Sequence, residues 1–153
     1  MAQKQDHSRI AWLDQFNEPD AKELRKSIPA EEQRLFDDAR KKLLAFDGVE
    51  EVPTWYGDCW HWVLEYRVPK LDAPLGVIIP SPEDLQLAIP MTAEFSQQVP
   101  LGRMKRAVRD GFDLGREPYD TEWAIWSLVP GSLLGDLIDL VKQKIKHLGA
   151  AKS

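Results

Sequence analysis

Residues 55–68 constrain the fold more than any other part of this chain. From Trp60 onward, large apolar side chains occupy every second position, namely Trp60, Trp62, Leu64, Tyr66 and Val68, and His61, Val63, Glu65 and Arg67 lie between them. Successive side chains of a β-strand point to opposite faces, so the alternation predicts a strand with an aromatic packing face and a mixed face. Each aromatic side chain can bury about 150–250 Å². The packing face therefore predicts a core strand covered by helices.

The other segments predict helices at both ends of the chain and strands between them. Apolar residues recur at helical spacing between Pro29 and Gly48 and again in residues 132–148, while residues 103–110 suit a short helix. Strands are expected at residues 49–56, 75–79, 85–91 and 121–129, and Pro53 favours an edge position for the first because it lacks an N–H. We expect an α+β fold: an antiparallel sheet of four to five strands flanked by amino- and carboxyl-terminal helices, in two layers.

The length of 153 residues suits one hydrophobic core. Residues 29–153 are expected to form the single α+β domain, and residues 1–28 an amino-terminal helical extension. Trp12, Leu13 and Phe16 lie in this extension. They could dock on the domain's own core, or they could bind a partner or a second copy of the chain as a homo-oligomeric adaptor.

The net charge of −5 argues against nucleic-acid binding, since phosphate affinity comes mainly from clustered Lys and Arg side chains. The single cysteine excludes an internal disulfide, and the first residues lack the apolar core of a signal peptide. No run approaches the roughly 18 apolar residues of a membrane span. We expect a cytoplasmic protein that binds neither membrane nor nucleic acid.

Motifs for catalysis or metal binding are not evident. The chain has no Gly-rich phosphate loop, Ser-centred elbow or paired-histidine motif. Asp58, Cys59 and His61 could ligate a metal, but the spaced second half of a structural zinc site is missing. We therefore predict no catalytic residue, no metal site and no cofactor, and enzyme activity is disfavoured.

The mixed face of the central strand is the first candidate binding site. His61, Glu65 and Arg67 share that face at two-residue spacing, which suits a pocket for a small molecule but also a solvated sheet face. In the pocket interpretation, His61 would titrate and Glu65 and Arg67 would anchor polar groups. Trp126 would form an apolar wall of this pocket. The strand alternation predicts that Trp126 and Trp55 lie on a different face from Trp60 and Trp62.

A basic run is the second candidate site. Arg103, Arg106 and Arg109 fall on the predicted short helix of an otherwise acidic chain. They could bind an anion or an acidic protein partner, although a solvated helix face would look the same. The ligand, the partner and the oligomeric state stay open, a homodimer included.

The order of these motifs resembles the YdhG-like families of small bacterial domains of unknown function. The resemblance covers residues 29–148 and rests on Trp55-Tyr56-Gly57, residues 60–67, 76–80 and 85–89, and Trp123-Ala124-Ile125-Trp126 before a lysine-ended helix. It implies a helix-flanked antiparallel sheet and no established activity. Some relatives are described as frataxin-like iron chaperones, and metal binding of that kind remains an alternative. Such a role would need an acidic ridge, whereas here Glu31, Glu32, Asp37 and Asp38 share their helix with Arg34, Arg40, Lys41 and Lys42.

Overall fold

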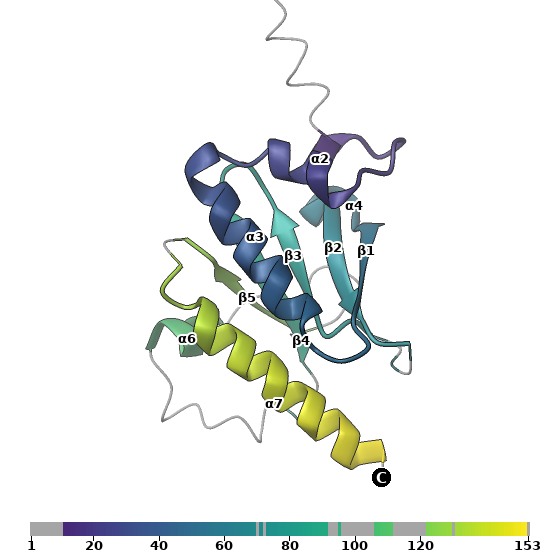
Figure 1. The fold of residues 1–153 in the computed structure, drawn as a ribbon, viewed down its shortest axis with the longest axis vertical. Coiled ribbons are helices and arrows are strands. Elements are labelled where there is room, and N and C mark those ends of the chain that lie inside the picture. The colour runs from purple at the N-terminus through teal and green to yellow at the C-terminus, as the bar shows by residue number, and fades with distance from the viewer. Residues whose placement is uncertain are drawn as a thin grey trace, which may run out of the picture.

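Five strands form one antiparallel sheet in the order β1-β2-β3-β4-β5 (Figure 1). The computed structural model describes residues 11–69, 71, 73–91, 95, 106–111, 122–129 and 131–152. The strands are β1 (Glu50–Trp55), β2 (Trp62–Arg67), β3 (Gly76–Pro80), β4 (Leu85–Met91) and β5 (Glu122–Ser127). The predicted α+β fold, with its antiparallel sheet and terminal helices, is confirmed. Pro53 lies on the edge strand β1, where its missing N–H costs no central ladder bond.

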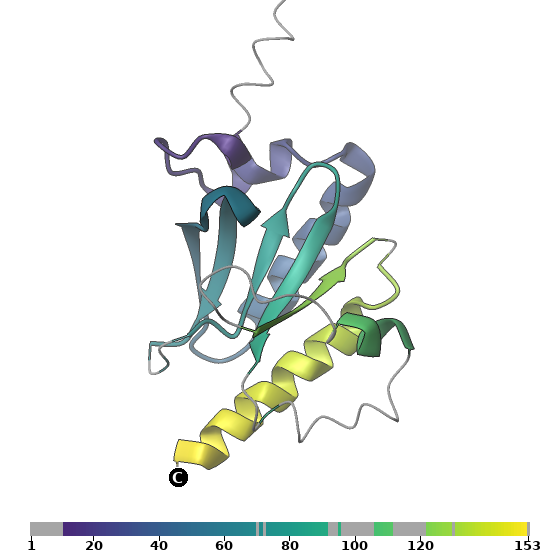
Figure 2. The same cartoon turned by 180° about the vertical axis from the view of Figure 1, so that it is seen from behind.

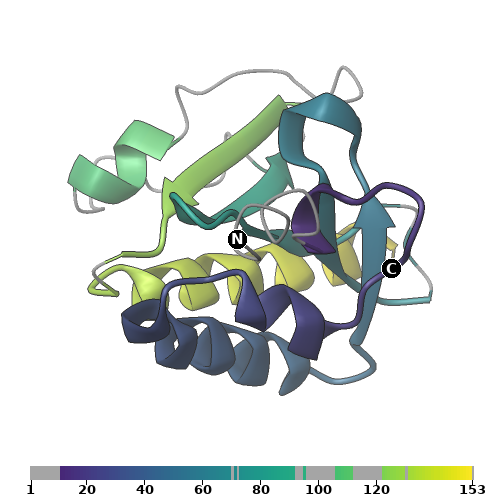
Figure 3. The same ribbon diagram turned by 90° about the horizontal axis from the view of Figure 1, so that it is seen from above.

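Two long helices, α3 (Ala30–Leu44) and α7 (Leu134–Lys152), lie side by side on one face of the sheet (Figure 3). The acidic first turn of α3 and its basic last turn suit the helix dipole. The main core fills the space between these helices and the sheet. It includes Phe36, Leu43, Leu64, Leu137 and Leu140, each at most 1% exposed. Among the described residues, no helix is long and apolar enough to cross a membrane.

The predicted alternation is wrong for its first two residues, Trp60 and His61. Trp60 ends a short helix, α4 (Gly57–Trp60), and β2 begins only at Trp62. Gly57 and His61 have positive φ angles of 73° and 57°, and Tyr56 N–H donates to His61 O at 2.7 Å. This tight turn breaks the two-residue period, because its residues do not lie in extended backbone.

Figure 2 shows the fold from behind the view of Figure 1. The second face of the sheet carries its own apolar cluster. It contains Tyr56, Trp60, Val63, Val77, Ile79, Ala88 and Trp123, all 9% exposed or less. The mixed face predicted for the central strand is therefore packed over much of its area.

The amino-terminal elements η1 (Ala11–Leu13) and α2 (Ala21–Lys26) contact each other, and η1 also contacts β2. Trp12 packs against both apolar clusters, and Leu24 and Ile28 belong to the main core. Asp20 and Glu23 form a capping box at the start of α2. The division of the chain between residues 28 and 29 stays a prediction, but residues on both sides of it share one core.

Candidate functional site

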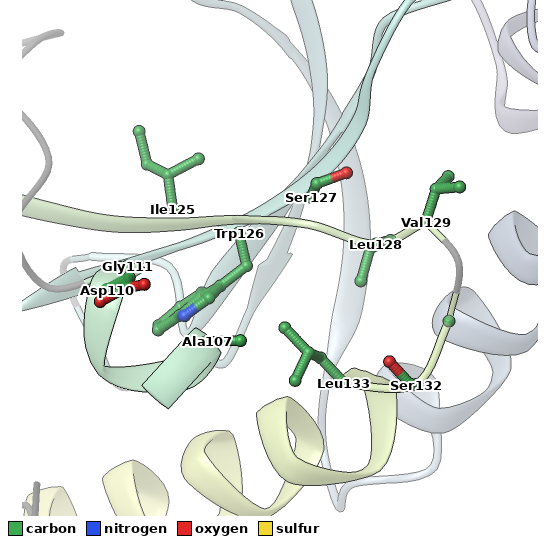
Figure 4. Close-up of a pocket in the computed structure, with 11 residues that line it drawn as sticks. Ala107, Asp110, Gly111, Ile125, Trp126, Ser127, Leu128, Val129, Ser132 and Leu133 are labelled. Atoms are coloured by element: carbon green, nitrogen blue, oxygen red, sulfur yellow. The ribbon is translucent and has the colours of Figure 1, made fainter. Parts of the chain in front are cut away.

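A pocket of about 460 Å³ lies between β5, the start of α7 and the short helix α6 (Arg106–Asp110) (Figure 4). Residues 125–129 and 131–133 form two of its walls, and Ala107, Asp110 and Gly111 form the third. The lining is mainly apolar. Its polar side chains among the described residues are those of Asp110, Ser127 and Ser132.

Trp126 joins α6 to the sheet at the base of this pocket. Its indole is 3% exposed, and Nε1 donates to Val108 O at 2.8 Å. Gly111 lies so close that a Cβ added there would be 2.2 Å from Trp126 Nε1. Only glycine fits at residue 111 with the indole in this position, so the pocket wall is closely packed.

The four residues predicted as one ligand site do not come together. Glu65 aligns across the sheet with Val77, Ala88 and Ile125, whereas Trp126 aligns with Leu87, Ile78 and Leu64. Aligned residues share a face, so Trp126 lies opposite Glu65 and on the same side as Trp62. The prediction also placed Trp55 on the face opposite Trp62. It is wrong, because Trp55 aligns with Trp62 across the sheet and therefore shares its face.

His61 precedes β2, so it does not belong to the strand alternation that Glu65 and Arg67 share. Its ring centroid is 4.5 Å from that of Trp12 and 5.5 Å from that of Trp55. These contacts place His61 among aromatic rings at the end of the strand.

Glu65 and Arg67 do share the second face of the sheet. Arg67 Nη1 donates to Glu65 Oε1 at 2.8 Å, and the Tyr56 hydroxyl donates to Glu65 Oε2 at 2.5 Å. The Glu65 side chain is 8% exposed. Both carboxylate oxygens thus have partners inside the protein, an arrangement that satisfies a buried charge. Whether Glu65 and Arg67 also meet a ligand stays a prediction.

The basic run is described only in part. Arg106 and Arg109 are exposed on α6, whereas Arg103 lies outside the described residues. Each of the two directly precedes a pocket residue, Ala107 or Asp110, in the chain, but neither lines the pocket. Anion or partner binding by these arginines stays a prediction.

The sequence interpretation missed most of the pocket. Its residues come from three separate segments, and Ala107, Ser132 and Leu133 have no chemical signature of their own. It also missed the aromatic group of Tyr56, Trp60 and Trp123 on the second face. The positive φ of Gly57 is the local cause, and the Tyr-Gly-Asp sequence was its signal.

Lys144 and Tyr66 are further buried ionisable groups outside the pocket. Lys144 is 5% exposed, and burial lowers its pKa from 10.5 to about 7. Burial also raises the pKa of Tyr66 well above 10, and its hydroxyl donates to Glu51 Oε2 at 2.6 Å. Arg40 in turn donates twice to Glu51, at 2.8 Å each. This network ties α3 to β1 and β2.

No protein-family model and no curated protein matches this chain. Within the described ranges, no group of three His, Cys, Asp or Glu side chains could hold a metal ion. The suggested ligands Asp58 and Cys59 lie outside the described side chains.

Proposed function

We propose that this protein is a binding module whose ligand occupies the pocket between α6, β5 and the start of α7. The observation that carries the proposal is the pocket itself, about 460 Å³ in volume with mainly apolar walls and a few polar groups. Ligand sites in proteins typically have volumes of about 300–1,000 Å³ and this kind of lining. The polar groups of Asp110, Ser127 and Ser132 would orient the ligand against the apolar walls.

The test is to fill the pocket from its exposed rim. Ala107 is an exposed pocket residue, so Ala107→Trp should occupy the cavity without disturbing the main core. Lys142→Trp is the matched control, because Lys142 is exposed on α7 and does not line the pocket. The probes are the fluorophore anilinonaphthalene sulfonate and a panel of aromatic and peptide fragments, followed by fluorescence and ligand-detected NMR.

We expect Ala107→Trp to weaken binding by about tenfold or more, equivalent to about 1.4 kcal/mol, and Lys142→Trp to bind like the wild type. If the probes and fragments bind the wild type and Ala107→Trp equally well, or bind neither, the proposed function is wrong.

A second candidate is an adaptor that binds through the amino-terminal segment. Phe16 is 89% exposed and Leu13 is 42% exposed, while Trp12 packs against the domain. Light scattering of the wild type and of a Leu13→Ser/Phe16→Ser variant tests this role, and an oligomer that survives both changes contradicts it. The cytoplasmic location and the YdhG-like resemblance remain proposals based on the sequence.

A further inference from the structure

The charge on the walls of the pocket distinguishes between the classes of ligand that it could bind. Asp110 is the only charged residue among the described residues that line it. Asp110 is exposed on α6, and its carboxylate makes no hydrogen bond or ion pair in the part of the chain that the structure describes. A carboxylate accepts hydrogen bonds and donates none. A cation placed beside Asp110 would therefore form an ion pair that the protein does not form by itself.

Two further carboxylates lie next to walls of the pocket. Ser127 lines the pocket, and its hydroxyl donates to Asp84 Oδ1 at 2.8 Å, so the Asp84 carboxylate is close to that wall. Asp136 lies in the first turn of α7, shortly after the lining residues 131–133. The amino end of a helix carries a partial positive charge of about +0.5, which by itself would favour an anion. The full negative charge of Asp136 offsets it at this wall.

The two arginines of α6 lie off the pocket face of that helix. Ala107 marks this face, because it lines the pocket. Successive residues of a helix are about 100° apart, so Asp110 lies about 60° from Ala107 around the helix axis. By the same spacing, Arg106 lies about 100° and Arg109 about 160° from Ala107. Neither arginine lines the pocket, which leaves Asp110 as the charge that a bound ligand meets on this wall.

The rest of the lining suits an apolar group. Ala107, Val129 and Leu133 line the pocket, and each is exposed or half-buried. Figure 4 shows the side chains of Ala107 and Leu133 pointing toward each other between α6 and the start of α7. Covering this surface with an apolar group removes it from water, which is favourable for any ligand of the right shape. The apolar walls therefore supply affinity, and the charge of Asp110 selects among ligands of similar shape.

We propose, resting on the proposed function, that the ligand is a small molecule with an apolar body and an ammonium group that pairs with Asp110. An ammonium has three N–H donors and no acceptor, which matches a wall that offers a carboxylate. Because Asp110 is exposed, the ion pair stays partly in water and its contribution is modest. Exposed ion pairs of this kind change affinity by at most about fivefold.

The probes are phenylbutylamine, phenylbutanol and phenylbutyrate, which share a benzene ring and a short alkyl chain but carry a positive, a neutral and a negative end group. Each is titrated into the full chain at neutral pH and low ionic strength and followed by ligand-detected NMR. We expect the amine to bind about three- to fivefold more tightly than the alcohol, and the carboxylate to bind more weakly than the alcohol. Added salt should reduce the preference for the amine, because salt screens the charge of the exposed Asp110.

On the protein side, Asp110→Asn keeps the shape of the side chain and removes its charge. We expect this variant to lose about three- to fivefold in affinity for phenylbutylamine and to bind phenylbutanol like the wild type. Asp139→Asn is the matched control, because it changes the net charge equally, and Asp139 is exposed on α7 and does not line the pocket. It should keep the wild-type preference for the amine. If Asp110→Asn does not fold, the three probes decide on the wild-type protein.

Three results would overturn this proposal. The first is that the wild type binds the alcohol or the carboxylate as tightly as the amine. The second is that Asp110→Asn keeps the full preference for the amine. The third is that Asp139→Asn loses this preference as much as Asp110→Asn does, because the preference would then reflect only the net charge of the chain. The proposed function survives each of them as long as Ala107→Trp still weakens the binding of phenylbutanol or of the fragments.

Discussion

Replacement of Lys144 by methionine should remove much of the protein's pH-dependent stability. Lys144 Nζ lies 2.7 Å from Pro90 O, 3.3 Å from Pro74 O and 3.5 Å from Leu75 O. It forms no ion pair with a carboxylate among the described residues. Burial therefore penalises the ammonium form and lowers the pKa of Lys144 to about 7.

The sign of the pH effect follows from the two states of the chain. In the unfolded chain Lys144 takes up its proton below about pH 10.5, whereas in the folded protein it does so only below about pH 7. The contribution of Lys144 to the free energy of unfolding is therefore highest above pH 10.5, falls as the pH drops toward 7, and then levels off. At about 1.4 kcal/mol per pH unit, the whole change is on the order of 5 kcal/mol.

Urea unfolding between about pH 7.5 and 9.5 measures this effect. The contribution of Lys144 over that range is a rise of about 3 kcal/mol with pH, which Lys144→Met should abolish. Lys142→Met is the control, because Lys142 lies on the same helix but is exposed, and it should keep the wild-type slope. Equal slopes for the wild type and Lys144→Met would refute the reasoning, as would a loss of slope shared by Lys142→Met.

Three further predictions concern the core. Trp62 is 6% exposed, so Trp62→Ala should cost about 3–5 kcal/mol in urea unfolding; a cost below about 1 kcal/mol would contradict its place in the core. Gly111→Ala should displace the Trp126 indole, lower the melting temperature and change the tryptophan fluorescence. A Cβ added at Gly135 on α7 would meet no atom within 4 Å, so Gly135→Ala should instead stabilise the protein by about 0.5–1 kcal/mol. A higher melting temperature for Gly111→Ala than for Gly135→Ala would rule out the close packing at residue 111. Finally, the pKa of Tyr66 is raised in the folded protein, so as the pH rises above 10 the unfolded chain loses the Tyr66 proton first and the free energy of unfolding should fall. In an alkaline titration, Tyr66→Phe should therefore unfold at a higher pH than the wild type. An unchanged unfolding midpoint would speak against this role of Tyr66.

Local patterns in the sequence were enough for most of the elements and for the class of the fold, although they missed α4. The apolar spacing in α3 and α7 and the alternation after Trp62 reflect periods that a helix or a strand imposes on every buried face. Pro53 could likewise be assigned to an edge strand from the sequence, since a proline has no backbone N–H to donate to a neighbouring strand. These features depend on neighbours along the chain, so they can be recognised before the chain is folded.

The candidate site depended on contacts between distant segments. The turn at Gly57 and His61 moved Trp60 to the second face, and the register between strands placed Trp126 opposite Glu65. Neither the register nor the position of α6 beside β5 is encoded by spacing within one segment. Both result from the way side chains pack between elements. For that reason only the tertiary structure could bring α6, β5 and residues 131–133 together around one pocket.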